Sequence, residues 1–569
     1  MTPFVLLDNA RTGEALLYRD PQAVVRADRP GDVPAALAVL RGHHAAGFIA
    51  YEAAAAFEPR LAALPGAAGQ PSAPPLLWFG LFGAPQRVDA DAFLPDPAGA
   101  WIGAPEPLVA RADYLARVAA AQDAIRAGDI YQANISFPAA ARWAGDPLAL
   151  YAGLRRRARA AHGALVFTGD HWILSLSPEL FFTLEGGVLT ARPMKGTAPP
   201  GSDPARLAGD PKQRAENLMI VDLLRNDLAR VAIAGSVAVP ELFRIEDYPT
   251  VQQMVSTVTA RIRPGCDAID ALTALFPCGS ITGAPKIRAM EVIAALEQAP
   301  RGVYTGAVGR VDPDGGAAFN VAIRTLVTTP GADRALLAMG SGIVADSDPA
   351  DEWRECLSKG AFVASDAGFD LIETIAFDPE DGLLRLEAHL ARLKASAAAL
   401  GFSFNRHAAR NELQAATFRL RAPARVRLLA SAGGSLAVEV RPMPPAPSEV
   451  VEVALAEMTV PRADLRRVHK TSDRAFYDDP RRAAGTFEVA FVDAEGFLTE
   501  GSFTNLFVER DGMLLTPPLA RGLLPGVLRA ELIAEGRARE ADLVPADLAG
   551  GFLIGNALRG LLRARLRPL

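Results

Sequence analysis

Three glutamates in the first two-thirds of the chain have a spacing that could form a metal site. Glu352 and Glu355 lie three residues apart on an expected helix, so their side chains face the same way. Glu216 opens another expected helix. Mg²⁺ favours a few carboxylates, waters and an anionic substrate, so these glutamates could bind it. The alternative is that all three are solvated glutamates on helix surfaces.

Two glycines and an arginine in the same part of the sequence could bind an anion. Gly340 and Gly342 would let backbone N–H groups approach an anion closely, and Arg324 could form a forked pair with a carboxylate. Each of these signals is weak alone, so the elements that would position the residues matter.

Hydrophobic periodicity predicts two helices in this region. The first covers residues 113–127 and is closed by Gly128, and the second covers 214–230. The second helix is expected to bury one face, which carries Leu218, Val221, Leu224 and Leu228. Strands are expected over 163–169 and 171–184, and the latter is interrupted at Ser177-Pro178-Glu179.

The pattern changes around residues 365–368, where a second domain is expected to begin. A strand over 369–377, a turn at 380–382 and a helix over 388–400 ended by Gly401 follow. We therefore place the boundary near residue 366, which gives the domains 1–365 and 366–569.

Composition indicates an ordinary globular protein. The chain has 569 residues, 50% of them apolar and 22% charged, with a net charge of −6, so at least two cores are expected. No basic bias indicates binding to nucleic acid or to a membrane. The first residues lack the features of a signal peptide, and residues 61–86 contain five prolines, which favours a loop leading into a strand over a membrane-spanning helix. We expect a cytoplasmic protein.

Five segments of the first domain together resemble the chorismate-utilising family, which includes anthranilate synthase, aminodeoxychorismate synthase component I and isochorismate synthase. They are the segments at 177–179, 192–197 (RPMKGT), 215–222 (AENLMIVD), 276–286 (FPCGSITGAPK) and 340–347 (GSGIVADS). The resemblance covers roughly residues 5–363. It implies an α/β (α+β) fold class with large, mainly antiparallel sheets flanked by helices.

The same resemblance implies roles for single residues. Glu216 and Glu355 would bind Mg²⁺, with Glu352 beside them through water. The metal would hold the ring carboxylate of chorismate. The substrate-binding residues would be Arg324, Tyr304, Gly340, Gly342, Lys359 and Thr282.

Lys195 distinguishes members of this family. Anthranilate synthases have alanine at this position, whereas the PMKGT form resembles aminodeoxychorismate synthase component I, in which the lysine is proposed to add to C2 of chorismate before ammonia enters at C4. Glu179 would move the proton of the departing hydroxyl. Lys195 could instead bind a carboxylate, be structural, or activate water as in isochorismate-type members. Gln253 stands where many relatives have a histidine that assists pyruvate loss.

The source of ammonia is expected to be outside this chain. A glutamine-hydrolysing domain needs a cysteine nucleophile in a tight glycine turn, and no GxCxG segment occurs. Cys278 is interpreted as a small buried residue. The chain would use free ammonia or a separate glutamine amidotransferase subunit.

The second domain resembles fold-type IV pyridoxal-phosphate enzymes, which include class IV aminotransferases and aminodeoxychorismate lyase. The resemblance covers residues 368–569 and implies two small α/β subdomains and a dimer through this domain. Lys470 would bind pyridoxal 5'-phosphate as a Schiff base, Glu500 would face the pyridine nitrogen, and Arg392 would bind the phosphate, assisted by the turns at Thr504-Asn505 and 526–527. Alternatively, Lys470 is solvated, Glu500 is a turn residue and Arg392 lies on a helix face. His389 is interpreted as structural, and 556–560 resembles a segment that lines the substrate pocket of lyases.

Together the two resemblances imply a bifunctional enzyme that makes 4-aminobenzoate for folate biosynthesis. Chorismate would be aminated at C4, and pyruvate would then be eliminated. The alternatives are an anthranilate- or isochorismate-type synthase joined to a class IV aminotransferase, and a chain in which one half is degenerate and only docks or regulates.

Overall fold

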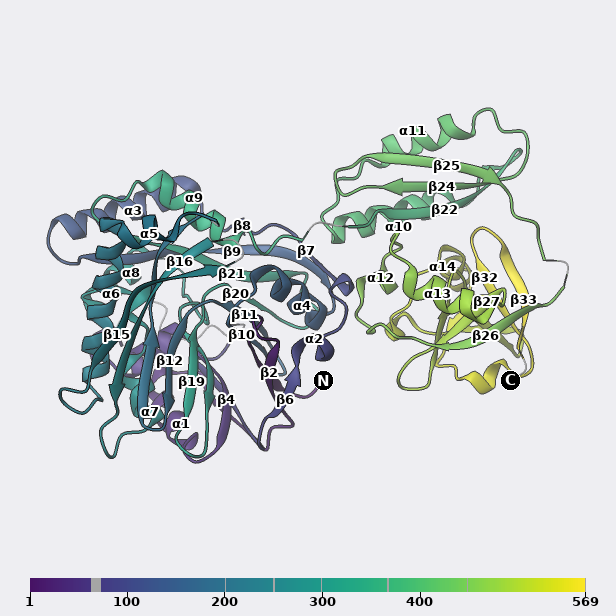
Figure 1. Cartoon of the computed structure of the whole chain (residues 1–569). Helices are drawn as coiled ribbons and strands as arrows, with labels where there is room; N and C mark the ends of the chain where they lie inside the picture. Colours follow the sequence, from purple (N-terminus) through teal and green to yellow (C-terminus); the bar gives the residue numbers. More distant parts are fainter. Residues whose placement is uncertain are drawn as a thin grey trace. The chain divides into compact units, whose positions relative to one another are not determined.

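The computed structural model describes residues 1–62, 73–199, 201–248, 251–297, 299–365, 368–447 and 449–567. The predicted boundary at residue 366 and much of the loop expected over 61–86 lie outside these ranges. The chain forms two compact units (Figure 1). The first comprises residues 1–94, 104–141 and 151–364, and the second comprises 95–103, 142–150 and 365–569. Among the described residues, no helix has both the length and the apolar character needed to cross a membrane.

Two large, mainly antiparallel sheets form the first unit. The first sheet runs in the order β17 (Gly283–Ala284), β9 (Gln132–Gly145), β21 (Arg334–Ile343), β20 (Thr325–Thr328), β11 (Trp172–Ser177), β10 (His162–Phe167), β1 (Phe4–Asp8), β2 (Glu14–Arg19) and β6 (Gln86–Asp89), and β8 (Glu106–Pro107) also pairs with β9. The second runs β14 (Met194–Ala198), β16 (Val251–Arg261), β13 (Val188–Arg192), β12 (Leu180–Glu185), β19 (Ala317–Val321), β18 (Ala307–Val311), β4 (His44–Ile49), β5 (Leu77–Phe82) and β3 (Ala23–Ala27), with β15 (Ala238–Tyr248) on β16. The expected α/β fold with large antiparallel sheets is confirmed.

Apolar faces of the sheets and helices form the core of this unit. One cluster joins Val5, Val166 and Ile173 of the first sheet to Phe48 and Trp78 of the second. A larger cluster covers the second sheet with helices α1 (Val33–Val39), α6 (Pro211–Ala229), α7 (Ala268–Leu275) and α8 (Lys286–Leu296). The other helices of the unit are α2 (Ala90–Phe93), α3 (Arg111–Arg126), α5 (Pro204–Gly209) and α9 (Pro349–Gly360), and α4 (Pro147–Ala158) lies mostly in it.

The two helices predicted in this unit are present, and the predicted burial of one side chain is wrong. Helix α3 ends next to Gly128, whose φ of 80° suits glycine, so the predicted stop is confirmed. Helix α6 buries Val221, Leu224 and Leu228 as expected, but Leu218 is 44% exposed. Successive residues of a helix are about 100° apart, so Leu218 lies about 120° from Leu224, at the margin of the buried face.

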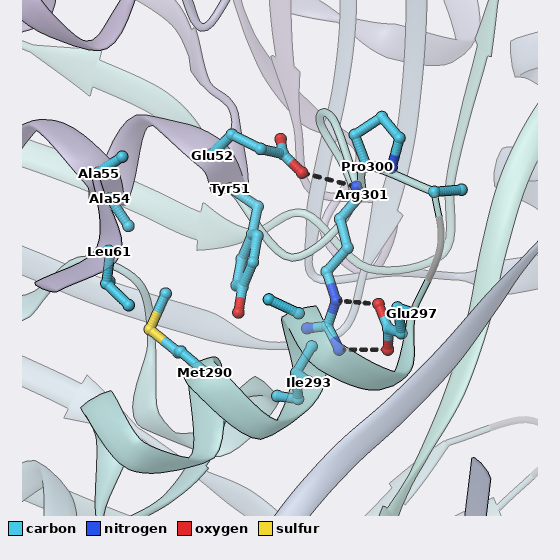
Figure 2. Close-up of a pocket in the computed structure, with 12 residues that line it drawn as sticks. Tyr51, Glu52, Ala54, Ala55, Leu61, Met290, Ile293, Glu297, Pro300 and Arg301 are labelled. Carbon is cyan, nitrogen blue, oxygen red and sulfur yellow. Dashed lines mark hydrogen bonds and ion pairs between the residues drawn. The ribbon is translucent and has the colours of Figure 1, made fainter. Parts of the chain in front are cut away.

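A buried ion pair connects helix α8 to the strand that follows α3. The Arg301 guanidinium donates to the carboxylate of Glu297 at 2.8 and 2.9 Å (Figure 2). It also donates to the Asn134 carbonyl at 2.6 Å. Glu297 also accepts from the backbone N–H of Ser136 at 2.7 Å. Glu52, on the 3₁₀ helix η2 (Tyr51–Ala56), accepts from the Arg301 backbone N–H at 2.6 Å. The network thereby fixes the segment that leads to Tyr304.

Replacement of Arg301 by methionine is expected to lower the free energy of unfolding of the first unit by about 3–5 kcal/mol, because the Glu297 carboxylate would stay buried without its cation. Urea denaturation of the full chain measures the loss. Arg60→Met is the control, since Arg60 pairs with Glu291 on the surface and is expected to change the free energy by less than about 1 kcal/mol. Equal effects of both variants would contradict the prediction.

The second unit contains a four-stranded and a larger sheet, the two subdomains expected from the sequence. The first has the order β23 (Gly382–Leu383), β22 (Leu371–Asp378), β24 (Ala424–Ala430) and β25 (Leu436–Pro442). The second has the order β28 (Leu498–Gly501), β27 (Glu488–Val492), β26 (Val451–Glu457), β33 (Gly560–Leu566), β32 (Phe552–Asn556), β29 (Asn505–Arg510), β30 (Met513–Thr516) and β31 (Ala538–Glu540). Its β26 pairs in parallel with β27 and β33.

Helices α10 (Leu386–Ala399) and α11 (Arg406–Thr417) pack on the four-stranded sheet. Helices α12 (Leu465–Val468), α13 (Ala475–Ala484) and α14 (Val527–Ala534) belong to the rest of the unit. The predicted strand and helix after residue 368 match β22 and α10, and the predicted turn lies between β22 and β23. Gly401 follows the helix with a φ of 64°. Strand β7 (Ala100–Ile102) pairs with the end of β9, and its Trp101 joins the core of the four-stranded sheet.

Candidate active sites

Lys195 lies on β14, at the edge of the second sheet of the first unit. The Asn217 side chain of α6 donates to the Lys195 carbonyl at 3.0 Å and accepts from the Ser256 hydroxyl at 2.6 Å, which fixes the strand on the helix. A Cβ placed on Gly342 would be 3.3 Å from the Lys195 amine. Glycine at 342 therefore leaves room for the amine beside the backbone of β21.

The burial of Lys195 favours an amine that gives up its proton readily. Burial and the nearby Lys359 ammonium lower the pKa of Lys195, whereas Glu179, Glu216 and Glu355 oppose this. A neutral amine is nucleophilic, so this environment suits a covalent or basic role.

Glu179 has the environment of a proton donor. Its carboxylate accepts from the Ser280 hydroxyl at 2.6 Å, and burial raises its pKa to about 7. A carboxyl group with this pKa holds its proton about half of the time at neutral pH and can act as a general acid. The predicted break between two strands brings it there, since β11 ends at Ser177 and β12 begins at Leu180.

Gly340 and Gly342, the glycines expected to bind an anion, lie within strand β21 beside two predicted substrate-binding residues. The Lys359 amine donates to the Gly340 carbonyl at 2.9 Å and pairs with Glu355 at 2.7 Å. A Cβ on Gly340 would be 2.9 Å from the Tyr304 hydroxyl, so glycine is required for this close approach. The amine of Lys359 and the hydroxyl of Tyr304 thus lie next to the strand segment that was expected to bind an anion.

Two of the three predicted metal ligands share one electrostatic environment. Burial raises the pKa of Glu216, which also faces the charges of Lys195 and Glu355. Burial opposes ionisation of Glu355, but the paired Lys359 outweighs it and keeps the pKa of Glu355 below its ordinary value. In the described part of the chain, no group of three or more acidic, histidine or cysteine side chains forms a metal cluster. Mg²⁺ needs only one or two protein carboxylates beside an anionic substrate and water, so Glu216 and Glu355 fit it.

Other predicted residues of this unit have local partners. Glu352 is half-buried on α9 and contributes to the field at Lys212 and Tyr114. The Thr282 hydroxyl donates to the Cys278 and Gly279 carbonyls, both at 3.2 Å. Cys278 itself is buried, and burial raises its pKa to about 12.

Arg324 and Gln253 are positioned through their backbones. Arg324 has a φ of 50° between β19 and β20, and its carbonyl accepts from the N–H of Leu176. Gln253 lies opposite Thr197 in the pairing of β14 with β16, two residues along from Lys195.

In the second unit, Lys470 follows the short helix α12 and connects to the four-stranded sheet. Its carbonyl accepts from the N–H of Ile372 at 2.9 Å. Burial lowers its pKa to about 7; Glu373 opposes the shift, while Arg392, Arg474 and Arg427 add to it. An amine with this pKa is neutral about half of the time at neutral pH, and the neutral form is the nucleophile that Schiff-base formation requires.

Glu500 is a buried carboxylate held at the end of β28. It accepts a hydrogen bond from the Tyr477 hydroxyl and another from the Leu524 N–H at 3.1 Å. Burial raises its pKa to about 7 in spite of these bonds. A carboxylate enclosed in this way would strongly favour a protonated ring nitrogen beside it.

Arg392 is tied to a buried carboxylate and to the turn before α14. It donates to Glu373 at 2.6 and 2.8 Å and to the Pro525 carbonyl at 3.0 Å. His389 bonds the same carboxylate at 2.7 Å. Burial opposes ionisation of Glu373, but Arg392 and His389 outweigh it and hold its pKa well below the ordinary value. Two of the five N–H donors of Arg392 remain available for a phosphate.

The turn after Glu500 is held by Glu488, a buried carboxylate. It accepts from the Ser502 N–H at 2.8 Å, the Phe503 N–H at 3.0 Å and the Thr504 hydroxyl at 2.9 Å. The Asn505 side chain donates to the Leu524 carbonyl at 3.3 Å, and a Cβ on Gly526 would overlap it at 1.9 Å. These contacts bring the 501–505 turn against the uncapped N-terminus of α14, where free N–H groups suit a phosphate. The arrangement fits pyridoxal phosphate, with Lys470 and Glu500 for its aldehyde and ring nitrogen.

Sequence reasoning missed several residues that build these sites. Glu488, Tyr477, Ser280 and Asn217 are buried polar side chains that hold the predicted residues in place. Glu500 and Lys470 were found because they stand in recognisable segments. Asn217 and Ser280 also stand in such segments, at 215–222 and 276–286, but were given no role of their own. Tyr477 and Glu488 belong to helix and strand patterns that do not show which partner they face.

Comparison with known proteins gives two family matches. The model described as chorismate binding enzyme matches residues 2–365, and the model described as amino-transferase class IV matches residues 370–566.

Individual relatives match the first region. An aminodeoxychorismate synthase component 1 of Salmonella typhimurium is 44% identical over 256 residues, which are 44% of this chain and 56% of that protein. An anthranilate synthase component 1 of Methanothermobacter thermautotrophicus is 42% identical over 263 residues, 45% of this chain and 56% of the relative. The match thus spans little more than half the length of these relatives. The crystal structure of anthranilate synthase component I from Streptococcus pneumoniae TIGR4 superimposes with a TM-score of 0.55 and 26% identity, over 62% of this chain and 92% of that one.

Proposed function

Because this chain belongs to the chorismate-binding enzymes and continues into a class IV aminotransferase-like region, we propose that it converts chorismate to 4-aminobenzoate in two steps. The first unit aminates chorismate at C4, and the second eliminates pyruvate from the product. The observation that carries the proposal is Lys195, whose amine lies among Glu179, Glu216 and Glu355. The resemblance to aminodeoxychorismate synthases rests on this lysine, since the corresponding segment of anthranilate synthases has alanine at this position.

In the first step, Lys195 acts as the nucleophile. Its neutral amine bonds to C2 of chorismate while the C4–O bond breaks, and protonated Glu179 gives its proton to the departing hydroxyl, which leaves as water. Ammonia then bonds to C4, and the bond between C2 and Lys195 breaks. Tyr304, Lys359 and the 340–342 segment of β21 orient the enolpyruvyl carboxylate.

Glu216 and Glu355 would hold Mg²⁺, with Glu352 beside them. When bound, Mg²⁺ supplies charge neutralisation at the ring carboxylate. Ammonia comes from a separate glutamine amidotransferase subunit or from solution.

In the second step, pyridoxal phosphate supplies an electron sink when bound. Glu500 favours the protonated ring nitrogen, and Arg392 together with the 501–505 turn positions the phosphate. Lys470 would remove the proton from C4. The C3–O bond would break, the departing enolpyruvate would take up a proton and leave as pyruvate, and the ring would become aromatic.

Product analysis of the full chain with chorismate, Mg²⁺, ammonium and pyridoxal phosphate tests the proposal. We expect 4-aminobenzoate and pyruvate in equal amounts, and no product when Mg²⁺ is withheld. Anthranilate or isochorismate as the only product would overturn it and would favour a synthase joined to an aminotransferase.

Replacement of Glu179 by glutamine is expected to slow amination by about 10²–10⁴-fold, because the amide keeps the bond to Ser280 but has no proton to give. For the wild type, the protonated fraction of Glu179 declines as the pH rises above its pKa of about 7, so the acid step weakens on the alkaline side. The rate of aminodeoxychorismate formation between pH 6 and 9 measures both effects. Glu185→Gln, on an exposed side chain at the end of β12, is the control and should keep the wild-type profile. A Glu179→Gln variant with wild-type rate and profile would show that another group supplies the proton.

A further inference from the structure

Part of the second unit is built from the first half of the chain. Residues 95–103 and 142–150 form one compact unit with residues 365–569. Trp101 is 9% exposed and joins the core of the four-stranded sheet, and a Cβ placed on Gly401 would be 2.8 Å from its ring. The core of the second unit is therefore incomplete without these earlier residues.

One of these stretches also contacts helix α12, which precedes the proposed Schiff-base lysine. The Arg466 guanidinium of α12 donates to the Asp96 carboxylate at 3.0 Å. A Cβ placed on Gly99 would be 2.9 Å from a carboxylate oxygen of Asp464, the residue that caps α12. Glycine at this position thus lets the backbone of the earlier stretch lie directly against the start of α12.

Arg466 connects both ends of residues 464–473, which are called the Lys470 segment below. Its guanidinium donates to Asp464 at 2.7 and 3.0 Å and to Asp473 at 3.0 Å. The side chains of Arg466 and Asp464 are 4% and 1% exposed. Loss of one partner of such a pair leaves the other charge buried without its partner, which is strongly unfavourable. Arg466 therefore holds the two ends of the Lys470 segment in one arrangement.

The opposite side of the Lys470 segment is held by backbone hydrogen bonds. The Lys470 carbonyl accepts from the N–H of Ile372 at 2.9 Å, and the N–H of Ser472 donates to the Asp370 carbonyl at 2.8 Å. These bonds fix the segment along the start of β22. The backbone of Lys470 thus lies between β22 on one side and the ion pairs of Arg466 on the other.

We propose that Arg466 is a positioning residue for Lys470, and that Asp96 supports it from the first half of the chain. The task of Lys470 rests on the proposed function, whereas the arrangement of its segment rests on the contacts of Arg466. The Lys470 amine must lie about 3 Å from the atom with which it reacts, and a displacement of about 1 Å can slow such a step about a hundredfold. Arg466 acts on the amine through the backbone of the Lys470 segment.

The test uses the full chain with Asp96→Ala, which leaves Arg466 paired with Asp464 and Asp473. The Asp96 side chain is 55% exposed, so the variant should fold. Pyridoxal phosphate is added to the cofactor-free protein, and the near-visible absorption of the lysine-bound cofactor is followed in time. We expect this absorption to appear about fivefold more slowly than in the wild type.

The same variant is tested with supplied aminodeoxychorismate. We expect kcat to fall about tenfold and KM to stay within about twofold, because the amine is displaced while the groups that bind the substrate are unchanged. Asp96→Glu keeps the carboxylate and should restore most of both rates. Urea denaturation of each variant measures the accompanying change in stability.

Arg466→Lys is the stronger variant, because it keeps a buried cation but loses the planar fork that reaches three carboxylates. We expect its kcat to fall about a hundredfold. If Arg466→Lys does not fold, the Asp96 variants still decide the question.

The matched control is Asp378→Ala, at the end of β22 away from Ile372. Asp96 and Asp378 each accept from the N–H of the residue two positions on, at 3.0 and 2.8 Å. Both variants therefore lose a turn contact, and Asp96→Ala loses the contact with Arg466 as well. Asp378→Ala should keep the wild-type absorption kinetics and kcat.

Wild-type absorption kinetics and kcat in Asp96→Ala would overturn the proposal, and a lower stability in urea alone would show that the contact is only structural. Failure of the proposed function gives a different result. In that case the wild type would not convert aminodeoxychorismate, while the absorption kinetics would still report whether Asp96 and Arg466 position Lys470.

Discussion

Replacement of Lys195 by alanine is expected to lower the amination of chorismate by at least about a thousandfold. The proposed step needs a neutral amine at this position. Burial and the neighbouring Lys359 lower the pKa of Lys195, and a lysine with a purely structural role would not need a lowered pKa. The loss should appear in kcat, because Tyr304, Lys359 and the 340–342 segment proposed to bind the substrate are unchanged in this variant. Formation of aminodeoxychorismate from chorismate and ammonium is the measurement.

Two comparisons make this result specific. The Lys195→Ala variant should still release 4-aminobenzoate from supplied aminodeoxychorismate at the wild-type rate, because that step belongs to the second unit. Lys212→Ala is the control for removal of a lysine from the same unit, since Lys212 is an exposed residue paired with Asp346 at 2.9 Å. If Lys195→Ala keeps more than a tenth of the amination rate, ammonia must enter without a covalent lysine step.

The sequence predicted secondary structure well where local signals were strong. The glycines at 128 and 401 follow helices, and the break at 177–179 separates β11 from β12. The predicted burial of Leu218 was wrong. Apolar character alone suggested burial, but the side chain lies outside the face that packs on the second sheet.

The reactive residues of the candidate sites could be predicted from the sequence, whereas most of the residues that hold them in place could not. Lys195, Glu179 and Gly342 come from three separate segments, and only the folded sheets bring them together. Glu488 stands in no recognised motif. Its function depends on the turn at 501–505, whose backbone N–H groups donate hydrogen bonds to its carboxylate. The segments 95–103 and 142–150 likewise carry no local signal that they belong to the second unit.

Replacement of Lys470 by alanine is expected to abolish the second step and to leave the first intact. Lys470 is the one residue proposed both to bind the cofactor and to move the C4 proton, so its removal should slow pyruvate loss by about 10³-fold or more. The purified variant should also lack the near-visible absorption of a lysine-bound cofactor. With chorismate, Mg²⁺ and ammonium, aminodeoxychorismate should accumulate in place of 4-aminobenzoate.

The matched control is Lys394→Ala, which removes an exposed lysine of helix α10 in the same unit and should change neither the absorption nor the products. Chromatography of the reaction mixture separates the outcomes. Aminodeoxychorismate that accumulates only in Lys470→Ala supports successive steps in two units, because an intermediate can build up only if its formation does not need Lys470. Continued release of 4-aminobenzoate at the wild-type rate would show that the first unit eliminates pyruvate itself. The low pKa of Lys470 and the enclosed carboxylate of Glu500 would then need another explanation.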